Sequence, residues 1–112
     1  MDPSSIYSQT LSQLGATEIS MTSPQGSALI QAAQPPDHQK AIQMLLDVHQ
    51  ARLALGNASL QAIADELKAN EQGLVDGTKA VQAAITALNN LTQILNSVAS
   101  LIGVVAKIVP MI

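Results

Sequence analysis

The chain has 112 residues, of which 47% are apolar, yet Tyr7 is the sole aromatic residue and the formal net charge is −3. Five Lys and Arg and a single ring provide neither a row of cations for phosphates nor a stacking platform for bases, so we expect no nucleic-acid partner. Without Cys, disulfide and thiolate chemistry is excluded. Aliphatic cores that lack rings are typical of helices packed on helices, which predicts an all-α fold.

Residues 1–36 are rich in Ser, Thr, Gln and Pro and contain no Lys or Arg. A turn signal (Ser-Pro-Gln-Gly) occupies positions 23–26, and two prolines at 35 and 36 interrupt regular structure. We therefore predict a polar, mostly irregular N-terminal arm over residues 1–36. The alternative is an export or docking segment that becomes ordered on assembly. No cleavable signal peptide is expected, because a cationic region followed by an apolar one is missing, which leaves the cytoplasm or export by a signal-independent route.

The segment after residue 36 begins with a signal for the start of a helix. Asp37 follows the two prolines and can cap the free N–H groups of the next turn. Helix-favouring residues continue from there, so we predict a helix over about 38–72. A Gly-Asn pair at positions 56 and 57 can interrupt it, and a break at 56–58 is left open.

A second helix is predicted over about 78–109, because no proline interrupts this stretch. The Asp-Gly pair at positions 76 and 77 is a strong turn signal between two helices of similar length. We therefore predict that residues 37–112 form a helical hairpin. One continuous rod is the competing architecture, since a column of leucines keeps a seven-residue step through both breaks. That column is Leu46, Leu53, Leu60, Leu67 and Leu74, followed by Val81.

The second helix carries a heptad pattern. With Val81 at position a and Ala84 at position d, more than four heptads are aliphatic without a miss, which predicts coiled-coil packing. The flanking e and g positions are mostly apolar too, so the apolar face is wide enough for more than two helices per bundle, or for a filament. The predicted oligomer interface is Val81, Ala84, Leu88, Leu91, Ile94, Leu95, Val98, Leu101, Ile102, Val105, Ile108 and Val109.

The opposite face of this helix is polar but uncharged. A water-facing helix usually carries Glu and Lys, which favour helix and keep chains apart. We therefore hypothesise that this polar stripe lies against other subunits or lines a lumen, where like charges from many copies would repel. The polar stripe consists of Gln82, Thr86, Asn89, Gln93, Asn96 and Ser100.

No set of residues predicts chemistry. His38 and His49 are eleven residues apart, about 16 Å along a helix, so one metal ion cannot bridge them. Asp65, Glu66 and Glu71 are best explained as a solvated helix face. We expect no catalytic, metal or cofactor site, and hence no enzyme.

The pattern as a whole favours a self-assembling structural subunit of a helical homo-oligomer or filament. A polar arm before a helical hairpin with a hydrophobic second helix is similar in layout to two-helix export-apparatus filament proteins, and that similarity implies an exported or secretion-related assembly. The first alternative is a membrane-active or pore-forming protein, because residues 87–109 are long enough to span a bilayer. A small binding or regulatory module that pairs with other helical proteins is the second.

Overall fold

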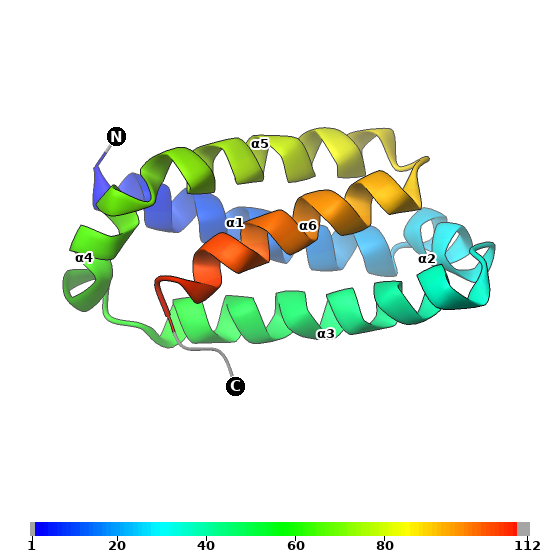
Figure 1. The fold of residues 1–112 in the computed structure, drawn as a ribbon, viewed down its shortest axis with the longest axis horizontal. Helices are drawn as coiled ribbons and strands as arrows, with labels where there is room; N and C mark the ends of the chain where they lie inside the picture. Colours follow the sequence, from blue (N-terminus) through cyan, green and yellow to red (C-terminus); the bar gives the residue numbers. More distant parts are fainter. Residues whose placement is uncertain (1, 110–112) are drawn as a thin grey trace.

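The computed structural model describes residues 2–109, and over this range it contains six helices and no strand, which confirms the all-α prediction. Four of the helices are long, and two short ones lie at opposite ends of the molecule (Figure 1). The long helices are α1 (Pro3–Thr22), α3 (Pro35–Asn57), α5 (Glu71–Ala87) and α6 (Leu91–Ala106), and the short ones are α2 (Pro24–Gln31) and α4 (Leu60–Ala69).

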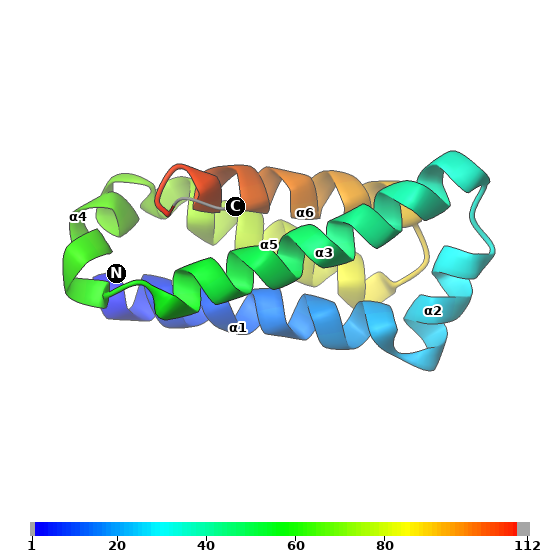
Figure 2. The ribbon, with the colours of Figure 1, turned by 90° about the horizontal axis from the view of Figure 1, so that it is seen from below.

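The long helices form an elongated bundle of 42 × 26 × 19 Å. α1 packs against α3 and α5, and α6 packs against the same two helices, which closes a ring in the order α1, α3, α6, α5. Successive long helices run in opposite directions along the bundle (Figures 1 and 2). Consequently α3 and α6 are parallel neighbours, and so are α1 and α5. The connection from α3 to α5 crosses the end of the ring through α4, which packs against α1.

The prediction of an irregular N-terminal arm is wrong, because a 20-residue helix, α1, occupies most of it. Asp2 caps α1 by accepting a hydrogen bond from the backbone N of Ser5 at 2.9 Å. Ile6, Leu14 and Met21 recur at helical spacing and are each only 1% exposed. The composition is that of an irregular segment, but the few apolar side chains lie on one face, and neighbouring helices cover that face.

Polar residues complete the buried face of α1. Thr10, Gln13 and Thr17 are at least as buried as many core aliphatics, with 1%, 7% and 1% exposed. The Thr17 hydroxyl donates to the carbonyl of Gln13 at 2.8 Å, so a polar group is satisfied within the helix itself. A helix rich in Thr and Gln can therefore face a core without a polar partner from another helix.

The turn signal at positions 23–26 separates α1 from α2. Ser23 caps α2 by accepting from the backbone N of Gly26 at 3.2 Å, and it also donates to the carbonyl of Ser20 at 2.6 Å. A Cβ on Gly26 would lie 2.8 Å from the Cα of Met21. Glycine is needed here because the two helices meet backbone to backbone.

The first predicted helix is confirmed in part. The break left open at 56–58 exists, since α3 ends at Asn57 and α4 starts at Leu60. The start differs, because α3 begins at Pro35 with proline in its first turn. Asp37 therefore lies in the first turn of α3 and is not its cap, although a carboxylate there is still favourable to the helix dipole.

The predicted hairpin turn at Asp76 and Gly77 is absent, because α5 runs straight through it. Gly73 and Gly77 face α6 instead, where an added Cβ would lie 3.3 Å from Val104 and 3.1 Å from Leu101. These glycines allow α5 and α6 to approach closely, and that close packing explains their presence within a helix.

The chain reverses eleven residues later, within the stretch predicted as one long helix. Leu88 ends α5 in the left-handed conformation, with φ 48° and ψ 44°. Asn90 then caps α6 by accepting from the backbone N of Gln93 at 3.0 Å. The reversal pairs α5 with α6 and lets both helices bury their apolar residues within one chain.

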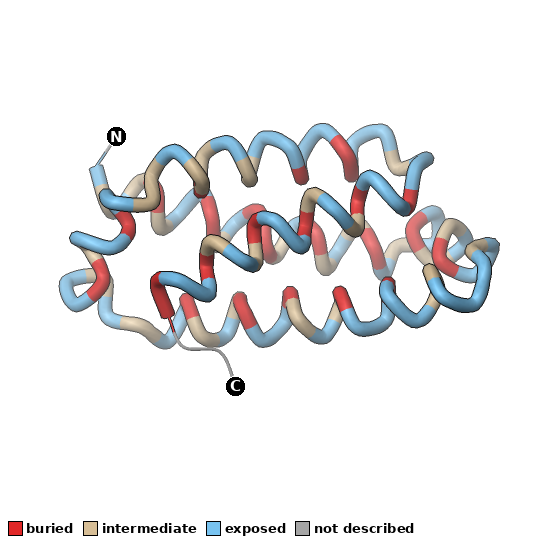
Figure 3. Tube along the Cα trace, in the orientation of Figure 1, coloured by how far each residue is buried: buried red, intermediate tan, exposed pale blue. Residues whose placement is uncertain are grey.

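The core follows the axis of the bundle, where the buried segments of all four long helices lie on the sides that face one another (Figure 3). In α6 the buried residues are Leu91, Ile94, Val98, Leu101 and Val105. They occupy heptad positions d and g, whereas position a is only partly buried. The fold is therefore not built on a single heptad seam of positions a and d that runs through both helices.

Candidate interaction surface

The two histidines make unrelated contacts. His38 places Nδ1 3.1 Å from the carbonyl oxygen of Ile30, and His49 places Nδ1 3.5 Å from a carboxylate oxygen of Glu18. Across residues 2–109 there is no group of three or more His, Cys, Asp or Glu that could hold a metal ion. These contacts are structural links between helices.

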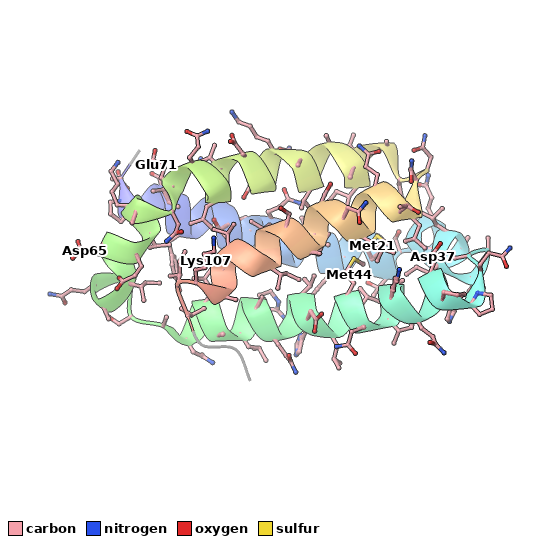
Figure 4. All side chains as sticks on the ribbon, viewed as in Figure 1. Met21, Asp37, Met44, Asp65, Glu71 and Lys107 are labelled. Carbon is pink, nitrogen blue, oxygen red and sulfur yellow. The ribbon has the colours of Figure 1, made fainter. Side chains whose placement is uncertain are left out.

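The acidic cluster lies at the α4 end of the bundle (Figure 4). Lys68 Nζ donates to Glu71 Oε1 at 2.9 Å, and this hydrogen bond lowers the pKa of Glu71 and raises that of Lys68. Asp65 and Glu66 beside them are exposed. The cluster is a solvated ion pair with two further carboxylates, as the sequence suggested.

The residues predicted as an oligomer interface are mostly interior to this chain. A partner helix could reach the buried ones only if the bundle opened, because they already pack against the chain's own helices. Leu88, Leu95 and Ile102 are partly buried against the same core. The buried residues are Val81, Ala84, Leu91, Ile94, Val98, Leu101, Val105, Ile108 and Val109.

The predicted polar stripe is exposed along its whole length, but it is not one surface. The reversal at Leu88 divides it between two antiparallel helices. Gln82 lies in the groove between α1 and α5, and Asn96 lies in the groove between α3 and α6. The structure therefore brings these residues to different sides of the molecule.

The seam between α1 and α3 is joined by polar contacts. Tyr7 Oη donates to the carbonyl of Leu55 at 3.0 Å, and Arg52 Nε donates to Glu18 Oε1 at 2.8 Å. With His49 against the same carboxylate, these contacts fix α1 on α3 along most of its length. These bonds are part of the internal architecture of the bundle.

The outer side of α3 carries exposed aliphatic side chains. Ile42, Leu46 and Leu53 are 53%, 54% and 46% exposed. Spacings of four and seven residues align them along one side of the helix, and we call these three residues the α3 stripe. Leu46 and Leu53 belong to the leucine column seen in the sequence, whose later members Leu67 and Leu74 are buried. The same sequence column therefore contributes buried core residues in α4 and α5 and exposed surface residues in α3.

A separate groove with a volume of about 500 Å³ runs between α3 and α6, and none of the three stripe residues lines it. Leu53 lines the groove on the other side of α3, toward α1. The apolar walls of the groove between α3 and α6 come from Met44, Leu95 and Ile102, which are buried or partly buried. Ala99 and Gly103 keep it open, because their side chains are minimal and a Cβ on Gly103 would meet nothing within 4 Å. We call this feature the α3–α6 groove.

Two charges mark the α3 side of the groove. Lys40 and Asp47 both line it, seven residues apart, and Gln43 between them donates to Asp47 Oδ1 at 2.9 Å. α6 contributes no charge, since its sequence from 91 to 106 contains no Asp, Glu, Lys or Arg. Apart from these two charges the α3–α6 groove is uncharged, and the α3 stripe lies outside it.

Sequence reasoning missed the α3 stripe because it assigned every apolar residue of the second helix to assembly. A signal was present in α3, where Ile42, Met44, Leu45, Leu46 and Val48 lie on more sides than one core-facing stripe needs. Which of them is exposed depends on where the neighbouring helices lie.

No protein-family model matches this chain, and neither a curated protein nor a solved structure matches it. Among the helices described over residues 2–109, none has the length and apolar character needed to cross a membrane. The helix that carries most of the span suggested by the sequence, α6, has 16 residues.

Proposed function

We propose that this protein is a non-catalytic helical subunit of a protein assembly, joined to its partner through the α3 stripe. The observation that carries this proposal is the exposure of Ile42, Leu46 and Leu53 along one side of α3. Covering three half-exposed aliphatic side chains would contribute roughly 1 kcal/mol each. Exposed aliphatic side chains aligned on one side of a helix are a feature of interaction sites.

The proposal keeps the self-assembly expected from the sequence and changes the surface that performs it. The heptad residues of α5 and α6 stabilise the subunit itself, while the outer side of α3 remains for contacts between subunits. The four long helices share one core, so the subunit can present this side of α3 without first becoming ordered.

The test compares two exposed aliphatic residues on different helices. Light scattering and sedimentation at micromolar concentrations should give a mass above the 11.6 kDa of one chain for the unmodified protein. Leu46→Glu should give a single-chain mass because it places a carboxylate in the interface. Ile19→Glu is the matched control, since Ile19 is 74% exposed on α1, and it should associate as the parent does.

Circular dichroism should show the same helicity for all three proteins, because both substituted side chains are exposed. A single-chain mass for the unmodified protein up to several hundred micromolar would refute the proposal. So would equal association of Leu46→Glu and the parent.

A further inference from the structure

We propose that two copies of this chain exchange α6, so that α6 of each copy packs into the bundle of the other. For this exchange, the reversal at residues 88–90 opens and α5 continues into α6 as one helix. The partner is a second copy of this chain, and the binding surface is the slot that α6 occupies against α3 and α5. The α3 stripe takes no part in the exchange, so this inference goes beyond the proposed function.

The reversal between α5 and α6 is short and strained. Among residues 2–109, Leu88 is the one residue other than glycine with a positive φ, and L-residues adopt this left-handed conformation at a cost. Only residues 88–90 separate the two helices, and none of them is Gly or Pro. All of them can therefore join a helix, which would relieve the strain at Leu88. Short connections under strain favour the exchange of an element between identical chains.

The heptad keeps its phase through the reversal. The buried residues of α6 occupy positions d and g, and the same two positions in α5 carry small residues throughout. A reversal does not require this phase, whereas a continuous helix does, because only then do both halves present one seam to a neighbour. The small half of this seam is Gly73, Gly77, Ala80, Ala84 and Ala87, and the large half is Leu91, Ile94, Val98, Leu101 and Val105.

The small half of the seam is complementary to the large half of an antiparallel copy. When a two-fold axis passes beside residue 89 of two antiparallel helices, residues equally distant from position 89 lie opposite each other. The resulting pairs are Gly73 with Val105, Gly77 with Leu101, Ala80 with Val98, Ala84 with Ile94 and Ala87 with Leu91. Within one bundle an added Cβ at Gly77 would already lie 3.1 Å from Leu101. The exchange therefore keeps this close packing and makes it intermolecular.

The exchanged pair also covers residues that one bundle leaves open. Ala80 and Ala87 are exposed in the bundle, and in the pair each lies opposite a large aliphatic residue of the other copy. No residue from 80 to 106 is charged, so the two long helices neither bury an ion nor oppose like charges. α2 lies at the same end of the bundle as the reversal, so the two copies meet at their α2 ends (Figure 1).

The exchange requires that α6 first leave its own bundle. Its buried residues must be exposed for this step, so folded protein interconverts slowly and refolding at high concentration gives the exchanged pair. Light scattering on protein that has stayed folded at micromolar concentrations therefore reports the α3 stripe alone. The two kinds of association are separated by how the sample is prepared.

Disulfide trapping shows which copy supplies α6. The chain has no Cys, and a Cβ at Gly73 would lie 4.0 Å from the Cβ of Val104, within the range of a disulfide. Gly73→Cys/Val104→Cys is refolded from urea at several hundred micromolar, separated by size and oxidised. In denaturing electrophoresis without reductant the dimer fraction should run as a covalent dimer, because each pair of thiols joins two chains. The monomer fraction of the same sample is the control and should run as a single chain.

A proline at the start of α6 tests the continuous helix. Thr92 is exposed and is the second residue of α6, a position where α3 itself has a proline, so Thr92→Pro is compatible with the bundle. In a continuous helix the same proline removes the hydrogen bond to the carbonyl of Leu88. Thr92→Pro should therefore lower the dimer fraction after refolding at least tenfold. Thr92→Ala is the matched control and should dimerise as the parent does.

The outcomes separate this inference from the proposed function. A dimer fraction that runs only as single chains after oxidation would refute the exchange and leave the α3 stripe as the interface. Equal dimerisation of Thr92→Pro and Thr92→Ala would refute the continuous helix, and so would a refolded parent without any dimer. Leu46→Glu added to Gly73→Cys/Val104→Cys should still give the covalent dimer, whether or not it abolishes association of the folded protein.

Discussion

α1 and α6 occupy opposite corners of the same ring of helices, yet their sequences are unlike. α6 has no charged residue and buries five aliphatic side chains. α1 is rich in Ser, Thr and Gln, and three polar residues make up half of the six side chains that it buries. The comparison shows that the spacing of side chains and the presence of neighbouring helices, more than apolar content, decide whether a segment joins the core.

The two helices are also held by different interactions. α1 is fixed to α3 by directional contacts, among them the bond from Arg52 to Glu18 at 2.8 Å. α6 is held by aliphatic packing, for which Gly73 and Gly77 of α5 provide close approach. Substitutions that distinguish these two modes test the comparison.

The largest effect is expected from removing one core leucine from each helix. Leu14→Ala in α1 and Leu101→Ala in α6 each create a cavity at a residue that is 1% exposed, and each should lower the free energy of unfolding by about 2–5 kcal/mol. Urea denaturation measures both. A small loss for Leu14→Ala beside a large one for Leu101→Ala would show that α1 is only loosely attached.

Glycine substitutions separate close packing from helix propensity. Gly103→Ala meets open space and should stabilise the protein by up to about 1 kcal/mol, as alanine favours helix. Gly77→Ala has the same propensity gain, but its Cβ lies 3.1 Å from Leu101, so overpacking of about 1–3 kcal/mol should outweigh it. Thermal unfolding midpoints that rise equally for both variants would contradict the close approach of α5 and α6.

Helix caps give a smaller effect. Asn90 accepts a hydrogen bond from the backbone of Gln93, so Asn90→Ala should cost about 0.5–2 kcal/mol by exposing an unpaired donor at the start of α6. Ser59 precedes α4 but makes no capping bond with its side chain. Ser59→Ala is therefore the matched control, and its denaturation midpoint should stay close to that of the parent. Equal losses would mean that the α5–α6 reversal does not depend on its cap.

The smallest effect concerns the solvated ion pair outside the core. The bond from Lys68 holds the pKa of Glu71 below its usual value, so its stabilisation is present above the pKa of an unfolded glutamate and is lost as pH falls through the lower folded value. Glu71→Gln should slightly lower the urea midpoint at neutral pH and have no effect at about pH 2. A difference that persists in acid would assign the loss to packing.

The sequence by itself determined the fold class and some boundaries. Aliphatic residues without rings indicated helices packed on helices, and the pair at Gly56 and Asn57 marked a real break, because both signals act locally. The heptad register did not predict the buried face of α6, whose buried residues are at positions d and g. The composition of α1 was misleading. Its few apolar residues have helical spacing, but the local sequence does not show that other helices will pack against them.

Only the tertiary structure decided which apolar residues stay outside. Gly77 can serve a turn or a close helix contact, and the position of Leu101 across from it selects the contact. Leu88 adopts a left-handed conformation that costs about 1–2 kcal/mol, a cost offset when α5 and α6 fold back and cover each other's apolar sides. Leu46 and Leu74 share one sequence column, but Leu74 lies on the core side of α5 and is 1% exposed, while Leu46 lies on the outer side of α3 and is 54% exposed. The position of each helix in the bundle therefore decides which leucine belongs to the candidate surface.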